Sequence, residues 1–262
     1  MSDGEVQGRR EPQGRQRRVP FEGVVNFRDL GGYRAASGRL TRWGRVYRSD
    51  SLHRLTVRDL QMFRGLGIRA VYDLRSDEER LLNPSPVASR QIAVESQVKR
   101  DEFKDGSAFR EASDADRRLL DVYLAILRTG GPLFGELLSV LATPGKIPAV
   151  IHCAGGKDRA GLAAALLLSS LGVDRETVLE DYELTNHTVT TARVKEILEL
   201  FVSAGMTHEA ALAFIRAPRS VMAEALAWLD SEFGGVEGYL AGPGGVRPEV
   251  LRDLRESLLE QE

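Results

Sequence analysis

The feature that most constrains the fold of this chain is a strand, a glycine-bearing turn and a helix in direct succession. Residues 148–151 form a short apolar run typical of a buried strand. Residues 162–168 are all Leu or Ala and are typical of a buried helix. The turn between them, residues 152–161, reads His-Cys-Ala-Gly-Gly-Lys-Asp-Arg-Ala-Gly. Backbone N–H groups converge in such a turn, and the positive end of the helix points at them, so the turn predicts an anion site.

Two side chains in the turn give this anion site a chemistry. Cys153 is the only cysteine in the chain, and Arg159 follows it after five residues, two of them glycine. The planar guanidinium of Arg159 can bind two phosphate oxygens, and the backbone amides of Ala154, Gly155 and Gly156 can bind the remaining charge. Cys153 would then lie beneath the phosphorus as a nucleophile. The helix and Arg159 are expected to lower the pKa of this thiol well below its ordinary value.

Other interpretations of the turn fail on its residues. A nucleotide-binding P-loop requires Gly where this chain has Ile151, and Ser or Thr where it has Asp158. A disulfide or a two-cysteine metal site requires a second cysteine, and the four histidines lack metal-ligand spacing, so we expect no metal site. An inert, buried cysteine would leave the surrounding His152, Lys157 and Arg159 unexplained together.

Four segments outside the turn occur in the order of motifs known from one enzyme superfamily. They are residues 26–33, 45–50, 73–76 and 181–186. Together with the turn they resemble the Cys-dependent protein tyrosine and dual-specificity phosphatases. The Gly-Lys-Asp-Arg form of the turn is similar to bacterial members that act on phosphotyrosine, phosphoserine/threonine and phosphoinositides. The resemblance runs from about Pro20 to the end of the chain, and it implies hydrolysis through a cysteinyl-phosphate with no metal or organic cofactor.

Further candidate site residues are charged. Asp158 lies inside the turn, and the resemblance implies that it is the general acid, with Asp73 in reserve. Asp73 and Arg75 follow a predicted strand, where ligands of open α/β sheets bind, although a strand-end ion pair explains them equally well. Lys157 and Arg48 are candidates for binding additional negative charge on a substrate. Lys157 could instead balance Asp158 or point outward.

Alternating helical and strand patterns predict a single α/β domain with a central, largely parallel sheet flanked by helices. Residues 1–19 are nearly devoid of apolar residues and predict a disordered tail, which leaves 20–262 as the phosphatase domain. Residues 119–141 show the apolar spacing of two helices. Residues 187–217 carry two apolar stripes separated at 203–205, so they form either a helical lid over the site or a hairpin packed on the core. Strands are predicted at 24–28, 45–48, 68–74, 92–94 and 148–151.

Composition narrows the class of protein further. A net charge of −2 at pH 7 argues against nucleic-acid binding. The apolar run 160–168 is too short to span a bilayer, so no integral membrane segment is expected. The N-terminal arginines precede no apolar stretch of the kind found in signal peptides. With one cysteine, these features predict a cytoplasmic protein, while secretion without a classical signal stays open.

The sequence therefore predicts a phosphomonoester hydrolase, most simply a protein tyrosine phosphatase. Phosphoserine/threonine and phosphoinositides are additional candidate substrates, so the expected partner is a phosphorylated protein or a phosphoinositide. A phospho-binding pseudophosphatase is the alternative of another class, but it typically lacks the Cys or the Arg, and this chain has both. A sulfurtransferase would also use a loop cysteine, but the spacing of Cys153 and Arg159 and the upstream motifs count against it. The oligomeric state is not predicted.

Overall fold

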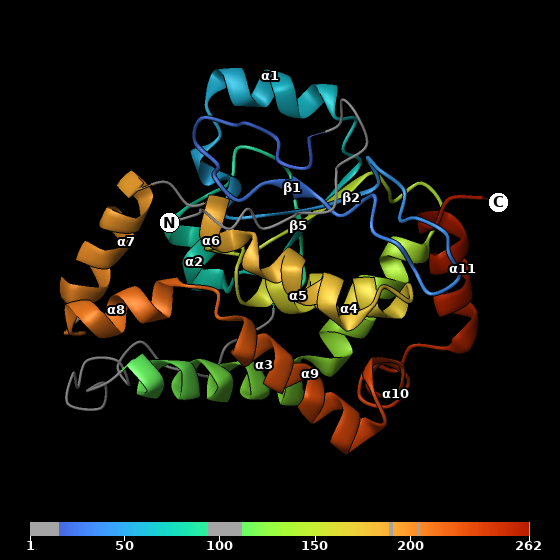
Figure 1. Ribbon diagram of the computed structural model, residues 1–262. Helices are drawn as coiled ribbons and strands as arrows, with labels where there is room; N and C mark the ends of the chain where they lie inside the picture. Colours follow the sequence, from blue (N-terminus) through green and yellow to red (C-terminus); the bar gives the residue numbers. More distant parts are fainter. Residues whose placement is uncertain (1–15, 94–111, 189–190, 204, 262) are drawn as a thin grey trace, which may run out of the picture.

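The computed structural model describes residues 16–93, 112–188, 191–203 and 205–261, and within them a five-stranded sheet (Figure 1). The strand order is β1-β2-β5-β3-β4. Only the pairing of β1 with β2 is antiparallel; the other pairings are parallel, which confirms the predicted fold class. The strands are β1 (Arg28–Asp29), β2 (Val46–Ser49), β3 (Ala70–Asp73), β4 (Arg90–Gln91) and β5 (Ala149–His152).

The register of the three central strands brings their C-terminal ends to one edge of the sheet. His152 at the end of β5 is paired with Ser49 of β2 on one side and with Asp73 of β3 on the other. The chain leaving β5 therefore emerges between the segments that follow β2 and β3. In a parallel sheet this edge is where ligands bind, because the loops that leave the strands converge there.

Helices cover both faces of the sheet, as the sequence predicts (Figure 1). On one face lies α1 (Val57–Gly65), where Phe63 packs in a small cluster with Val71 and Val150. Ile151 points the opposite way, into the main core, because successive side chains of a strand alternate. That main core is formed with the helices α3 (Ala112–Ala142), α4 (Arg159–Ser170), α5 (Arg175–Glu183) and α9 (Arg219–Phe233).

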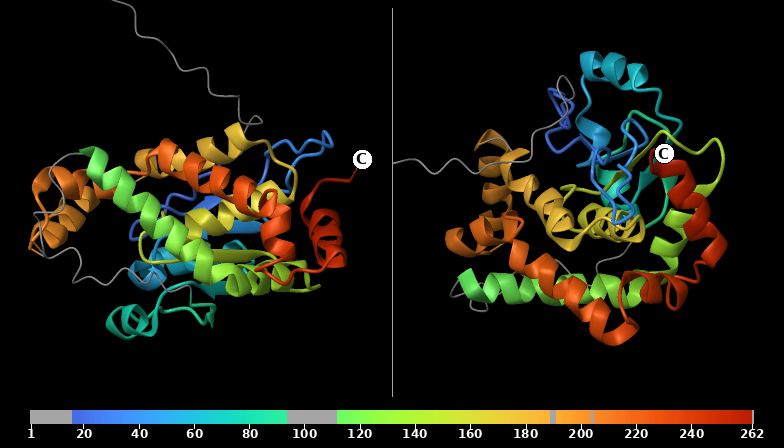
Figure 2. Two further views of the ribbon diagram at one scale, coloured as in Figure 1. Left: turned by 90° about the horizontal axis from the view of Figure 1, so that it is seen from below. Right: turned by 45° about the vertical axis from the view of Figure 1, so that its right-hand side comes forward.

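The remaining helices surround this core. Helices α7 and α8 lie at one end of the molecule and α11 at the other, as both views in Figure 2 and the view in Figure 1 show. Helix α8 packs on both α7 and α3, while α11 packs on α3. These surrounding elements are η1 (Leu52–Arg54), α2 (Asp77–Leu82), α6 (Thr185–Thr188), α7 (Thr191–Ser203), α8 (His208–Ile215), α10 (Val236–Ala241) and α11 (Pro248–Leu258).

Several helix starts follow from their capping residues. Thr56 and Asp59 form a complete capping box at the start of α1. Ser76 and Glu79 do the same for α2, so each side chain satisfies a backbone N–H that the first helical turn leaves unpaired. The side chain of Asp174 accepts the Thr177 N–H and begins α5. The sequence predicts such helix starts because a capping box involves only two residues that lie three positions apart.

Three predicted elements differ in the structure. The strand predicted at 92–94 is instead β4 at Arg90–Gln91, and residue 94 lies outside the described residues. The predicted strand 24–28 is confined to its last residue, because the carboxylate of Asp50 accepts the N–H groups of Val25 and Asn26 that a strand ladder would use. The two helices predicted within 119–141 are one helix, α3, which continues through Pro132. Gly131 and Gly135 lie in close contact with residues 243–244, where an added Cβ would clash.

The described part of the predicted tail is attached to the domain. The guanidinium of Arg17 donates to the carbonyls of Asp29 and Gly31 and lies over the rings of Tyr33 and Trp43. Residues 1–15 of that tail lie outside the described residues, as does most of the charged segment 99–116.

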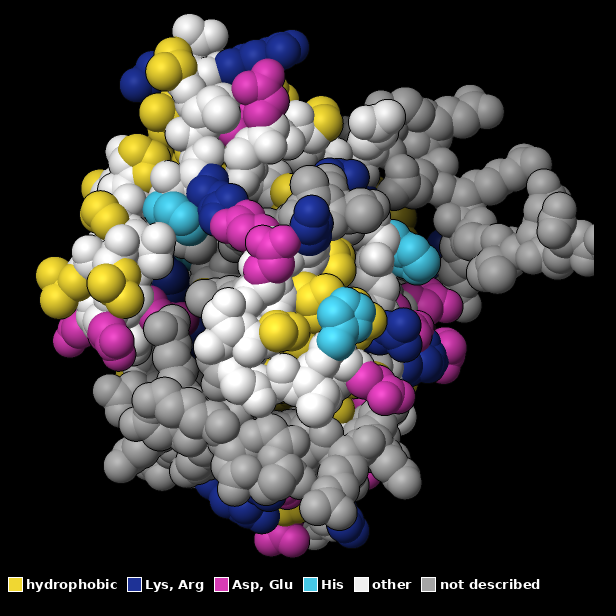
Figure 3. Space-filling model, turned by 90° about the vertical axis from the view of Figure 1, so that its left-hand side faces the viewer, with side chains coloured by type: hydrophobic (Ala, Val, Ile, Leu, Met, Phe, Trp, Pro, Cys, Tyr) yellow, Lys and Arg dark blue, Asp and Glu magenta, His cyan; other side chains and the backbone are white. Residues whose placement is uncertain are grey.

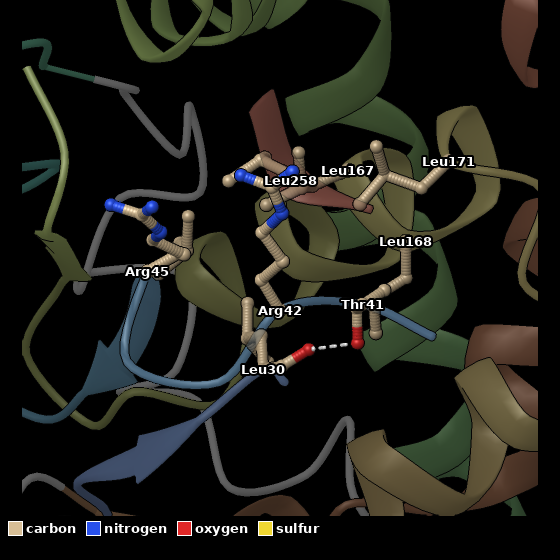
Figure 4. A pocket seen from close by; sticks show the side chains of 9 residues that line it. Leu30, Thr41, Arg42, Arg45, Leu167, Leu168, Leu171 and Leu258 are labelled. Atoms are coloured by element: carbon tan, nitrogen blue, oxygen red, sulfur yellow. Dashed lines mark hydrogen bonds between the residues drawn. The ribbon is translucent and has the colours of Figure 1, made fainter. Parts of the chain in front are cut away.

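One described helix passes a length and hydropathy test for a membrane span. Residues Ala115–Ala142 of α3 are apolar enough over such a window, but half of the window is buried inside the protein. A core helix gives the same signal. A small pocket of about 10 Å³ lies among Leu30, Thr41 and leucines of α4, with room for about one water molecule (Figure 4).

Candidate active site

The turn between β5 and α4 has its carbonyl groups held from outside. The carbonyls of Ala154 and Gly155 accept from the Ser51 N–H at 3.0 Å and from the Asn26 side-chain amide at 3.2 Å. The Gly156 carbonyl accepts from Arg48 at 2.7 Å. Because the carbonyl and the next N–H of a planar peptide point in opposite directions, the following amides are turned inward. The turn therefore directs the N–H groups of residues 155–157 inward as a cradle, one residue later than the predicted amides of residues 154–156.

Cys153 lies at the base of this cradle. Its Sγ accepts a hydrogen bond from the inward N–H of Gly156 at 3.2 Å, and the residue is 1% exposed. Burial raises the pKa of the Cys153 thiol, and Asp158 and Glu79 add to the rise, while Arg159 and the Ala160 N–H oppose it. The expected lowering of this pKa is thus wrong for this structure, because the thiol is fully buried.

Gly156 explains why the cradle contains glycine. Its φ of +69° lies in the left-handed region, which side chains disfavour. An added Cβ would also come within 2.6 Å of the backbone of Ser49 and Asp50. The cradle therefore packs directly on the chain that leaves β2, and only glycine fits there.

Arg159, the first residue of α4, is fixed by a carboxylate. Its two terminal nitrogens donate to Oε2 and Oε1 of Glu79 at 2.6 and 2.7 Å, and one of them also donates to the Leu74 carbonyl. Burial alone would lower the pKa of Arg159, but the bonds to Glu79 raise it above its ordinary value. Likewise, burial alone would raise the pKa of Glu79, but Arg159 holds it at about 2.

Asp158 and Lys157 follow the glycines and point to different partners. The Asp158 side chain is 31% exposed, and its Oδ1 accepts from the hydroxyl of Tyr123 at 2.9 Å. The Lys157 ammonium is buried and donates to the carbonyls of Phe214 and Arg216, at the end of α8 and just beyond it. It also lies 3.3 Å from Asp158 Oδ1. Asp158 is thus positioned to reach a ligand, while Lys157 attaches the turn to residues 214–216.

Arg48 supports the turn from beneath and does not face the cradle. It is fully buried, and besides the Gly156 carbonyl it binds Asp181 at 2.6 Å. Asp181 also binds Arg28 and the hydroxyl of Tyr33, so its pKa is held well below the ordinary range despite its burial. Asp181 is thus the shared partner of two buried arginines, Arg28 and Arg48.

Asp73 and Arg75 bind each other at the end of β3. Arg75 donates to both carboxylate oxygens of Asp73, and it also binds Ser51 and the Asn83 carbonyl. Asp73 is fully buried, 3.6 Å from His152 Nε2. Burial lowers the pKa of His152 to about 4, so its ring is neutral near pH 7. Of the two interpretations left open for Asp73 and Arg75, the structure shows the strand-end ion pair.

Comparison with known proteins identifies the family. Residues 19–260 match the model of a tyrosine phosphatase family. The triple-specificity protein phosphatase PtpB of Mycobacterium tuberculosis is 30% identical over 90% of this chain and 97% of its own length. A Cupriavidus necator protein with a provisional tyrosine-protein phosphatase name is 28% identical over 90% of this chain and 84% of its own length. A tyrosine-protein phosphatase of Nostoc commune is 26% identical over 78% of this chain and 70% of its own length. The chain belongs to the tyrosine phosphatase family.

Membership of the tyrosine phosphatase family confirms the predicted activity class. The chain is a phosphatase that acts on phosphorylated substrates, and this interpretation prevails over the pseudophosphatase and sulfurtransferase alternatives. The residues of the cradle are contiguous in the sequence, which is why the motif was sufficient to find them.

Other residues at the site of this tyrosine phosphatase were missed in the sequence. Glu79 reads there only as a helix cap, and Tyr123 only as one apolar position of a core helix. Asn26 and Tyr182 lie within motifs, but the motifs do not predict which residues their side chains contact. Each reaches the site through the tertiary fold. Asn26 and Glu79 contact residues that lie 129 and 80 positions away in the sequence, and the two tyrosines come from α3 and α5.

Proposed function

We propose that this phosphatase hydrolyses phosphotyrosine through a cysteinyl-phosphate, with Cys153 as nucleophile, Arg159 and the cradle amides as oxygen ligands, and Asp158 as general acid. The observation that carries this assignment is the set of three outward-held carbonyls at 154–156. They aim the following N–H groups at the space above Cys153, where the oxygens of a phosphoryl group would develop charge.

The order of events follows from the side chains. Cys153 first loses its proton to solvent, and the resulting thiolate attacks phosphorus while the phosphorus–oxygen bond of the ester breaks. The leaving oxygen takes a proton from Asp158, which is the partly exposed carboxylate of the cradle. A water molecule, deprotonated by the same carboxylate, then attacks the cysteinyl-phosphate and releases inorganic phosphate. Arg159 holds oxygens throughout through the N–H groups that Glu79 and Leu74 leave free.

Phosphoserine/threonine and phosphoinositides are proposed as additional substrates, in the cytoplasm. The support is the name of the triple-specificity relative and the form of the turn. The positive charge of Lys157 does not support a lipid headgroup in this arrangement, since its ammonium is bound by two carbonyls. Figure 3 views the face formed by the α7 and α8 side of the molecule, where acidic, basic and hydrophobic side chains are interspersed.

The test is phosphate release from 4-nitrophenyl phosphate, a phosphotyrosine peptide and a soluble phosphoinositide. Cys153→Ser should abolish turnover but retain binding of the phosphopeptide, and Arg159→Ala should lose both. Retained turnover by pure Cys153→Ser protein would refute the covalent mechanism. An absence of phosphoinositide hydrolysis by the wild type would restrict the enzyme to phosphoproteins.

A further inference from the structure

Asp158 has an unusual position for an aspartate that precedes a helix. Such a residue normally turns its carboxylate back to accept the first free N–H groups of the helix. Asp158 is the N-cap of α4, yet its side chain makes no capping hydrogen bond. Its Oδ1 instead accepts from the Tyr123 hydroxyl at 2.9 Å and lies 3.3 Å from the Lys157 ammonium. Both of these donors therefore approach the same carboxylate oxygen.

The hydroxyl of Tyr123 is itself directed by a second tyrosine. Its oxygen lies 2.7 Å from that of Tyr182. Tyr123 donates its hydrogen to Asp158 Oδ1, which accepts it whether or not Oδ2 carries a proton, so Tyr182 must donate to Tyr123. Burial raises the pKa of both phenols far above their ordinary value, and Asp158 raises them further, so both keep their hydrogens. The hydrogen bonds therefore all run in one direction, from Tyr182 to Tyr123 and from Tyr123 to Asp158.

Packing keeps this chain in place. Both tyrosines are at most 1% exposed, and their rings meet edge to face with centroids 6.2 Å apart. Tyr123 comes from α3 and Tyr182 from α5. The ring of Tyr182 packs on the first turn of α4, where a Cβ at Gly161 would lie 3.3 Å from it. Three helices of the core therefore fix the position of the Tyr123 hydroxyl relative to the turn.

We propose that Tyr123 is a positioning residue for Asp158, which it holds by Oδ1 so that the proton for the leaving group is carried on Oδ2. The inference rests on the proposed role of Asp158 as general acid. As the sulfur–phosphorus bond forms, the electron pair of the breaking phosphorus–oxygen bond passes to the leaving oxygen, which takes the Oδ2 proton. In the second half of the reaction, Oδ2 takes a proton from the attacking water.

The contribution of Tyr123 depends on the leaving group. Its hydrogen bond becomes charge-assisted, and therefore stronger, as Asp158 gives up its proton in the transition state. A poor leaving group such as the tyrosine phenol requires that proton, whereas 4-nitrophenol leaves with little assistance. Loss of the Tyr123 hydroxyl should therefore reduce kcat for phosphotyrosine more than kcat for 4-nitrophenyl phosphate.

The experiment compares Tyr123→Phe with Tyr239→Phe. Tyr239 is a matched control, because it is also fully buried and its hydroxyl donates to the Leu127 carbonyl of α3, away from the turn. In Tyr123→Phe, kcat should fall about tenfold for phosphotyrosine and about twofold for 4-nitrophenyl phosphate, part of the roughly 10²–10⁴-fold that a general acid supplies. KM should be unchanged for both, and Tyr239→Phe should match the wild type.

The outcomes separate this inference from the proposed function. Asp158→Asn should itself show the leaving-group selectivity, and adding Tyr123→Phe to it should add none. If Asp158→Asn reduces kcat equally for both substrates, the assignment of Asp158 as general acid fails. If Asp158→Asn is selective and Tyr123→Phe is not, only the role of Tyr123 is overturned. Should Tyr123→Phe fail to fold, Tyr182→Phe is measured instead, because it removes the donor to Tyr123. Its kcat should again fall more for phosphotyrosine than for 4-nitrophenyl phosphate, but by a smaller factor. Equal reductions of kcat on the two substrates would overturn the inference.

Discussion

Glu79 and Arg159 face each other as a two-point pair, with Glu79 Oε2 and Oε1 at 2.6 and 2.7 Å from the two terminal nitrogens of Arg159. Glu79 Oε2 also accepts the Ser76 N–H at 2.8 Å, so the same carboxylate begins α2. The pair occupies one edge of the guanidinium, and the Leu74 carbonyl occupies a further N–H. In the proposed mechanism the N–H groups on the Nε side bind the phosphate, so Glu79 would set the orientation in which Arg159 meets its ligand.

Replacing Glu79 should therefore impair every substrate alike. In Glu79→Gln the guanidinium loses its fixed orientation, and kcat/KM should fall about tenfold for both 4-nitrophenyl phosphate and phosphotyrosine, the scale of one charge-assisted hydrogen bond. Glu78→Gln, an exposed neighbour on the same helix, is the control. A loss confined to the poor leaving group would assign Glu79 to proton transfer and contradict this role.

The same substitution should make the thiol more acidic. Glu79 is one of the negative charges that raise the pKa of Cys153, and Arg159 opposes them. With the charge of Glu79 removed, the thiolate is less disfavoured, so its pKa should fall. Alkylation of Cys153 by iodoacetamide, followed against pH, should show a lower midpoint in Glu79→Gln than in the wild type. An unchanged or higher midpoint would contradict the electrostatic account.

Stability against pH gives a second measurement on this carboxylate. The pKa of Glu79 is lowered from 4.5 to about 2 in the folded protein. A depressed folded pKa stabilises the native state above the unfolded pKa, and this stabilisation is lost as pH falls from about 4.5 towards 2. The difference in free energy of unfolding between wild type and Glu79→Gln, from urea titrations, should be constant from pH 7 to 5 and shrink below 4.5. A difference as large at pH 3 as at pH 7 would show that Glu79 acts by packing alone.

Replacement by alanine should destabilise the protein at one of two adjacent glycines in the cradle and leave its stability nearly unchanged at the other. Gly156 has φ +69° and no room for a Cβ, so Gly156→Ala should cost about 3 kcal/mol of stability through strain and steric conflict. Gly155 is exposed, with nothing within 4 Å of an added Cβ, so Gly155→Ala should change stability by no more than about 0.5 kcal/mol. Calorimetric unfolding of both variants is the measurement. Equal stability of the two would mean that the turn can rearrange.

The ammonium of Lys157 should control access to the thiol. It attaches the cradle to the carbonyls of Phe214 and Arg216, at the end of segment 187–217, which the sequence predicts to be either a lid or a packed hairpin. If this segment shields Cys153, Lys157→Met should speed inactivation by hydrogen peroxide several-fold, and bound phosphate should protect both forms. Lys195→Met, on the exposed face of α7, is the control. Equal rates for wild type and Lys157→Met would favour a hairpin packed on the core.

The sequence was sufficient for features whose parts are close together in the chain. The cradle, the capping boxes of α1 and α2, and the break between α7 and α8 at Gly205, with φ +98°, each lie within a few residues. The alternation of strands and helices then fixed the parallel sheet, because a crossover of this kind leaves few topologies. Ser203 is the last residue of α7, as the apolar stripes predict.

Side-chain partners were beyond the sequence where they depend on the tertiary fold. An arginine beside an anion site has the same sequence signature whether it binds the ligand or a backbone carbonyl, so Arg48 was assigned to the substrate. The carboxylate of Asp50 replaced a strand ladder at Val25 and Asn26 because a side chain 24 residues away competed for those N–H groups. The thiol pKa was expected to fall because the motif contains Arg159 but not the distant Glu79 or the depth of burial.

The lone cysteine at the base of the cradle also makes the protein a single-thiol reagent in its own right. Any adduct formed by a thiol-specific probe resides at Cys153 without mutagenesis, so the mass increase of the intact chain counts occupied active sites directly. Because the residue is 1% exposed, the rate of labelling also reports how often the cradle opens to solvent. Labelling of one thiol thus measures both the number of occupied sites and the rate at which the cradle opens.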